Sequence, residues 1–92
     1  MRWAVYFDSK YLPPFPLSSG SIERRMKCFP IIEARGLELA SELKQAWPEI
    51  TVIRGFNGIL GCEIEIPEED EEALVAAILE RYDCEILPAE TI

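Results

Sequence analysis

Histidine is absent from this chain of 92 residues, and cysteine is scarce. Without imidazole the sequence lacks the commonest general base and the commonest metal ligand, so Ser-His-Asp, Cys-His and histidine-rich zinc sites are excluded. The 3 cysteines are an odd number and include no C-x-x-C pair, which fits reduced thiols better than a disulfide framework. We therefore expect no metal and no other cofactor.

Long apolar runs are also missing. No stretch approaches the ~18 apolar residues that a membrane-spanning helix needs, and residues 1–8 lack the longer apolar stretch of a secretory signal. With 49% hydrophobic and 28% charged residues, the composition is typical of one folded domain covering residues 1–92. The sequence therefore predicts a single cytoplasmic domain that does not bind a membrane.

Positive charge is in short supply, because the chain has 9 bases against 17 acids and a net charge of −8. Residues 1–46 hold seven bases and five acids, whereas residues 47–92 hold two bases and twelve acids. A negative chain is repelled by phosphate backbones unless its cations cluster on one face. Nucleic acid is therefore a disfavoured partner, and a basic protein or the basic end of a second copy is a favoured one.

Hydrophobic periodicity predicts an alternation of strands and helices. Residues 3–8 alternate as a strand, residues 31–47 form a helical stripe that Pro48 ends, and strands 50–54 and 60–66 flank an Asn57-Gly58 turn signal. A second helix follows Pro67, and residues 84–87 return as a strand whose Pro88 indicates a sheet edge.

The order strand, helix, strand, strand, helix, strand is typical of the split βαβ, or ferredoxin-like, sandwich. We therefore predict an α+β fold with a four-stranded antiparallel sheet and two helices on one face. Residues 9–30 are an insertion in this scheme. Residues 9–21 have the proline and serine content of a long loop, and residues 22–29 fit a short helix or an edge strand, of which we favour the helix.

Two glutamates are predicted to share one face of the second hairpin strand. Alternation in residues 60–66 points the apolar side chains to the core and leaves Glu63 and Glu65 on the outer face. At roughly 6 to 7 Å apart they can serve acid–base work or bind a hard cation, but the sequence supplies no third ligand. Arg54, across the hairpin, can neutralise one of them. We interpret the pair as part of a solvated outer face.

That outer face is also predicted to hold Tyr6, together with Ile50 and Val52 or their neighbours. Split βαβ domains can pair through this face or through an edge strand, so it is a candidate contact surface. The acids at residues 68–72 fit a different purpose, because negative charge is favoured at the N-terminus of a helix.

The chain has one concentrated group of cations, Arg24, Arg25 and Lys27, and the aromatic residues Tyr11 and Phe15 lie near it in the sequence. Cations interleaved with aromatic rings are typical of sites that bind single-stranded nucleic acid. The strands, however, lack the Lys/Arg-Gly-Phe/Tyr signature of RNA-binding sheets. We favour a cluster that forms ion pairs with the acidic second helix, within the chain or across a dimer.

Cys28 is the candidate reactive thiol, because Cys28-Phe29-Pro30 precedes the predicted helix and neighbouring cations lower a thiol pKa. The stretch resembles thioredoxin-like motifs, and residues 37–52 resemble the helix-to-strand segment of selenoprotein-W-like redox proteins. Ile31 stands where the second cysteine would be, and the last strand does not fit that family. No family is therefore assigned.

These observations predict a non-catalytic protein-interaction or regulatory module that acts as a homodimer or as an accessory subunit. One alternative is an acidic inhibitor of a basic enzyme, of the antitoxin, immunity or nucleic-acid-mimic type, because the net charge is −8. A second alternative is a thiol-based redox protein that uses Cys28.

Overall fold

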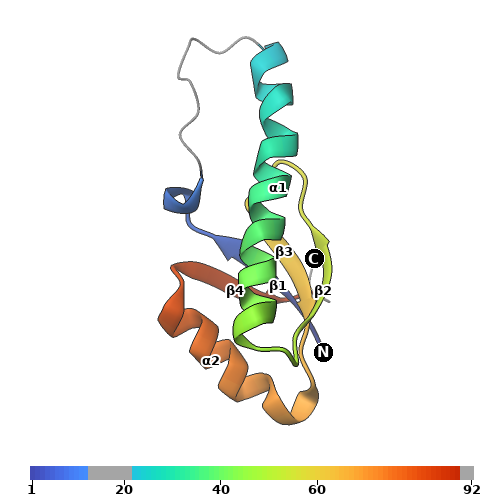
Figure 1. Ribbon diagram of the computed structural model, residues 1–92, viewed down its shortest axis with the longest axis vertical. Coiled ribbons are helices and arrows are strands. Elements are labelled where there is room, and N and C mark those ends of the chain that lie inside the picture. Colours follow the sequence, from blue (N-terminus) through green and yellow to red (C-terminus); the bar gives the residue numbers. More distant parts are fainter. Residues whose placement is uncertain (13–21, 90–92) are drawn as a thin grey trace.

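The computed structural model describes residues 1–12 and 22–89, with the side chains of residues 22–28 left out (Figure 1). The elements, with η for a 3-10 helix, are β1 (Arg2–Phe7), η1 (Ser9–Tyr11), α1 (Ile22–Ala46), β2 (Thr51–Gly55), β3 (Gly61–Glu65), η2 (Glu68–Asp70), α2 (Glu71–Arg81) and β4 (Cys84–Pro88). The predicted α+β class, with two helices and a four-stranded antiparallel sheet, is confirmed. The proline-rich stretch at 13–21 lies outside the described residues.

The strand order in the sheet is β2-β3-β1-β4, and every neighbouring pair is antiparallel. β1 is therefore a central strand, and β3 separates it from β2. The β2–β3 hairpin turns through Gly58, whose φ of 80° is the conformation that an Asn-Gly turn signal predicts. β4 is an edge strand, as Pro88 at its end indicates.

Both helices contribute to one hydrophobic core on one face of the sheet. Val5 of β1 pairs with Cys62 of β3, and both side chains are fully buried beneath the helices. α1 adds Leu39, Ala40 and Leu43, and α2 adds Leu74 and Ile78. In Figure 1, α1 runs across the sheet and α2 lies at its lower left. The sheet therefore has one covered face and one face turned away from the helices.

α1 is longer than the sequence predicted. It is a single helix of 25 residues that includes Pro30, rather than a short segment at 22–29 followed by a helix from residue 31. Proline lacks only one backbone N–H, so the helix loses one hydrogen bond there and continues. At about 37 Å, α1 is roughly twice as long as a five-residue strand, and its first turns extend beyond the sheet (Figure 1). Among the helices that the structure describes, none combines the length and apolar character required to cross a bilayer.

Candidate functional site

The sheet face turned away from α1 and α2 carries most of the predicted site residues that the structure describes. Strand register assigns its members, because residues that pair across the sheet point to the same side. We call this surface the open face, and it comprises Arg2, Ala4, Tyr6, Thr51, Arg54, Gly61, Glu63, Glu65, Glu85 and Leu87. Within the described residues, no helix covers it.

Glu63 lies at the centre of the open face between two arginines. Nε of Arg54 donates a hydrogen bond of 3.1 Å to Oε1 of Glu63, and the guanidinium of Arg2 lies 3.8 Å from Oε2. The Glu63 side chain is only 11% exposed, whereas those of Arg2 and Arg54 are 61% and 59% exposed. The predicted neutralisation by Arg54 is therefore present, and Arg2 is a second partner that the sequence analysis missed.

Glu65 shares the face with Glu63 but not its partners. It is exposed, and no described base lies within ion-pair distance of it. The two carboxylates therefore have different surroundings, because Glu63 is shielded and ion-paired whereas Glu65 is solvated. The solvated outer face that we predicted is therefore present at Glu65 but not at Glu63, whose side chain is shielded.

An aromatic stack borders Glu63. The rings of Tyr6 and Phe56 are stacked with centroids 5.5 Å apart and an interplanar angle of 19°, and the Arg54 guanidinium lies 4.9 Å from the Phe56 centroid. The rings close over Gly61, where an added Cβ would lie 3.0 Å from the Phe56 ring. Phe56 follows β2 and belongs to no periodic pattern, so the sequence analysis did not place it here.

Ile50 and Val52 do not join Tyr6 on the open face, which corrects part of the expectation for this surface. Ile50 is fully buried, and Val52 pairs with core-facing Ile64 and packs against the core. A register shift between Val52 and Arg54 then brings Arg54 opposite Glu63. The open face instead contains Thr51, a neighbour of both residues, as the sequence analysis also allowed.

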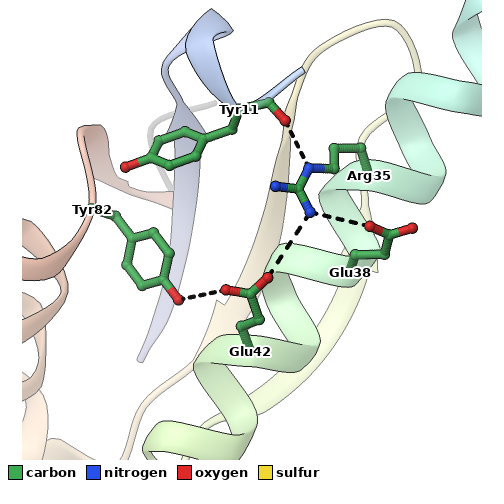
Figure 2. A network of polar contacts seen from close by, with 5 residues as sticks. All are labelled: Tyr11, Arg35, Glu38, Glu42 and Tyr82. Carbon is green, nitrogen blue, oxygen red and sulfur yellow. Dashed lines mark hydrogen bonds and ion pairs between the residues drawn. The ribbon is translucent and has the colours of Figure 1, made fainter. Parts of the chain in front are cut away.

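Tyr11 lies on the opposite side of the molecule, where it joins a polar network between η1, α1 and Tyr82 at the C-terminal end of α2 (Figure 2). Nε of Arg35 donates a 2.7 Å hydrogen bond to the Tyr11 carbonyl oxygen, and its terminal nitrogen lies 3.1 Å from Glu38 and 3.9 Å from Glu42. The Tyr82 hydroxyl donates a 3.1 Å hydrogen bond to the other Glu42 oxygen.

The ring of Tyr11 is also engaged within the chain. It packs against Phe7 and Tyr82 at centroid distances of 6.0 Å each, and its hydroxyl accepts a 2.9 Å hydrogen bond from the backbone N–H of Asp83. Lys10 forms an ion pair with the Asp83 side chain beside it. Tyr11 therefore packs η1 against the C-terminal end of α2, and its ring and hydroxyl contacts lie within the chain.

The remaining predicted site residues cannot be placed. Phe15 lies outside the described residues, and so do the side chains of Arg24, Arg25, Lys27 and Cys28. The structure therefore brings together Arg54 and Glu63 of the predicted set, and it separates them from Tyr11.

The two described thiols are free and poorly suited to thiolate chemistry. Burial, with a smaller contribution from the Cys84 thiol, raises the pKa of Cys62 to about 12 from 9.0. Burial also raises the pKa of Cys84. Both groups stay protonated at neutral pH, whereas the thiolate is the nucleophile.

The described side chains form no cluster of three or more Cys, Asp or Glu residues able to hold a metal ion. The acids at 68–72 occupy η2 and the first turn of α2, and none of them pairs with a described base. No family model, curated protein or solved structure matches the chain.

Proposed function

We propose that the chain is a ferredoxin-like, non-catalytic interaction module that associates with a second copy of itself through the open face. The position of β3 between β1 and β2 supports a split βαβ arrangement. The observation that carries the function is the composition of the open face: two arginines and a stacked Tyr6–Phe56 pair surround a shielded glutamate. Tyrosine, phenylalanine and arginine are enriched at protein interfaces.

Charge favours a second copy as the occupant of this surface. The open face holds two bases, Arg2 and Arg54, and three acids, Glu63, Glu65 and Glu85. It is therefore nearly balanced on a chain whose net charge is −8. In a two-fold interface the same patch meets itself, so a patch with both signs can be self-complementary whereas a patch of acids cannot.

Exposed apolar area on the same face supports the contact. Leu87 of β4 pairs with Ala4 across the strands and is 40% exposed, beside the partly buried ring of Tyr6. Burying these groups against a second copy removes apolar surface from water, at roughly 25 cal/mol per Å². We also propose a cytoplasmic location, which the free thiols of Cys62 and Cys84 support.

The test is the molar mass in solution as a function of concentration, measured by sedimentation equilibrium. We expect wild-type protein to convert from monomer to dimer as concentration rises. Leu87→Lys places a strongly hydrated cation on the open face and should weaken the dimer about ten-fold or more. Because Leu87 is exposed in the monomer, the variant should still fold, which circular dichroism checks.

Ile59→Lys is the matched control. Ile59 lies in the hairpin loop outside the open face and is 53% exposed, so the same change of apolar side chain to lysine should leave the dimer unchanged. A wild-type chain that stays monomeric at all accessible concentrations would contradict the proposal. Equal weakening by both variants would also contradict it, because the contact would then not be on the open face.

A second candidate is the acidic inhibitor of a basic enzyme. It is favoured by the acids of η2 and α2, which pair with no described base and so present uncompensated negative charge. Affinity purification at low and at high salt, analysed by mass spectrometry, tests it. Strongly basic nucleic-acid enzymes that are retained only at low salt support this function, and recovery of the chain as a multimer of itself contradicts it.

The redox alternative depends on Cys28, since the other two thiols have raised pKa values. The reaction rate of Cys28 with a thiol reagent, measured against pH in a Cys62→Ala/Cys84→Ala chain, tests it. A pKa below that of an ordinary cysteine supports redox chemistry, and an ordinary pKa rejects it.

A further inference from the structure

A groove separate from the open face lies between α2 and the side chain of Trp3. Its volume is about 520 Å³, within the range of ligand-binding clefts. Trp3 lies on the covered side of β1, and Val75 and Leu79 of α2 form the facing apolar wall. Leu79 is 48% exposed, so this wall is not closed by the core. The groove is an apolar surface that the fold leaves open.

The rim of this groove is negatively charged. Glu68, Glu71 and Glu72 line it together with the apolar residues, and none of the three pairs with a described base. An anionic ligand or an anionic lipid surface is repelled by such a rim, and cationic groups are attracted. The groove therefore selects for a ligand that is apolar at its centre and basic at its flanks.

The ring of Trp3 forms the other apolar side of the groove. Its indole Nε1–H is buried and has no acceptor among the described residues, so this nitrogen is closed off from a ligand in the groove. The groove therefore presents the carbon atoms of the Trp3 ring.

We propose that this groove binds a short peptide segment of a partner protein, in which an apolar residue is flanked by lysine or arginine. The apolar side chain packs against Trp3, Val75 and Leu79, and the cations pair with the glutamates of the rim. A second copy of the chain is a poor occupant, because a two-fold contact through the groove brings the two sets of rim glutamates together. This surface is independent of the open face and of the dimer proposed there.

The first experiment follows the indole ¹H–¹⁵N resonance of Trp3 in the full chain. The probe is a short acetylated and amidated peptide in which one leucine has lysines on both sides. The other tryptophan, Trp47, is removed as Trp47→Phe to assign the resonances. We expect the peptide to shift the Trp3 resonance in a saturable way at low salt, and we expect salt to weaken the binding.

Two double variants test whether the rim carboxylates contribute to peptide binding. Glu71→Gln/Glu72→Gln removes two rim carboxylates, and Glu69→Gln/Asp70→Asn removes two neighbouring carboxylates that do not line the groove. Both pairs change the net charge equally at the same helix start. We expect the first pair to weaken peptide binding about five-fold or more and the second pair to weaken it less than two-fold.

The apolar wall is tested in the same way. Leu79→Ala should weaken binding several-fold, and Leu37→Ala on α1, a residue of similar exposure, should not. The proposal is overturned if the Trp3 resonance does not move, or if a peptide with glutamates in place of the lysines binds as well. It is also overturned if both carboxylate pairs weaken binding equally, or if concentrating the Leu87→Lys chain, in which the open-face dimer is weakened, shifts the Trp3 resonance. None of these results depends on whether the open face forms a dimer.

Discussion

Gly36 of α1 lies so close to Gly61 of β3 that a Cβ added to Gly36 would be 2.7 Å from the Gly61 carbonyl oxygen. The Gly61 oxygen belongs to the backbone and the added Cβ would be bonded directly to the backbone, so neither atom can move away by rotating a side chain. The contact sets how near α1 approaches the sheet, and α1 carries Leu39 and Leu43 into the core directly after it. A side chain at position 36 would therefore push the helix away from the core.

We predict that Gly36→Ala destabilises the chain by about 1 to 3 kcal/mol, the range of overpacking substitutions. In an exposed helix the same change stabilises by about 1 kcal/mol, so the sign of the effect is diagnostic. Urea unfolding followed by circular dichroism measures it. Ser41→Ala, at an exposed position of the same helix, is the control and should leave stability unchanged or raise it. A stabilised Gly36→Ala chain would contradict the close approach.

The hydrogen bond from Tyr82 to Glu42 should contribute measurably to stability. Tyr82→Phe removes the hydroxyl that donates to Glu42 and should cost about 0.5 to 1.5 kcal/mol. A double-mutant cycle with Glu42→Ala should give a coupling energy of about 0.5 kcal/mol or more. Tyr11→Phe is the control, since its hydroxyl contacts the Asp83 N–H instead, and it should be additive with Glu42→Ala. Additivity in both cycles would show that the Tyr82–Glu42 bond contributes nothing.

Arg54 should stabilise the monomer more than Arg2 does. Both side chains are about equally exposed and face Glu63, but Arg54 lies closer and also contacts the Phe56 ring. We expect Arg54→Ala to cost about 1 kcal/mol and Arg2→Ala about half of that or less. Unfolding is measured at low protein concentration, so that self-association does not contribute. A larger loss of stability for Arg2→Ala than for Arg54→Ala would contradict this prediction, because the distance to Glu63 would then not decide how much each arginine stabilises the monomer.

Stability should fall at alkaline pH because Cys62 is buried. Its pKa is about 12 in the folded chain and near 9.0 when unfolded, so between these values the unfolded chain binds fewer protons. The free energy of unfolding then decreases as pH rises, by up to about 1.4 kcal/mol per pH unit for this group. Cys84, whose pKa is also raised, acts in the same direction.

Unfolding midpoints measured from pH 8 to 11 check this expectation. Cys62→Ala should show a shallower loss of stability with pH than the wild type, whatever its absolute stability. Parallel curves for the two chains would show that Cys62 does not titrate differently in the folded and unfolded states.

Much of the secondary structure could be predicted because local patterns determine it. Alternation in residues 60–66 predicted the buried Cys62 and Ile64 and the outward Glu63, and the structure has all three. α1 was predicted too short, since the local effect of Pro30 on the preceding residue was outweighed by the helix on both sides of it. The alternation left open whether Val52 or its neighbours face outward, because a register shift in β2 decides which residue lies opposite Glu63.

By itself, the sequence determined that histidine-based chemistry is unavailable, because the chain contains no histidine. It also determined which side of a strand such as residues 60–66 is apolar, because period-two alternation is a property of a short segment. Only the tertiary structure decided that Arg2 meets Glu63, that Phe56 stacks on Tyr6, and that Trp3 lines one groove with the acidic start of α2. These contacts join residues far apart in the chain. They depend on the register between strands and on the placement of helices, which no local pattern specifies.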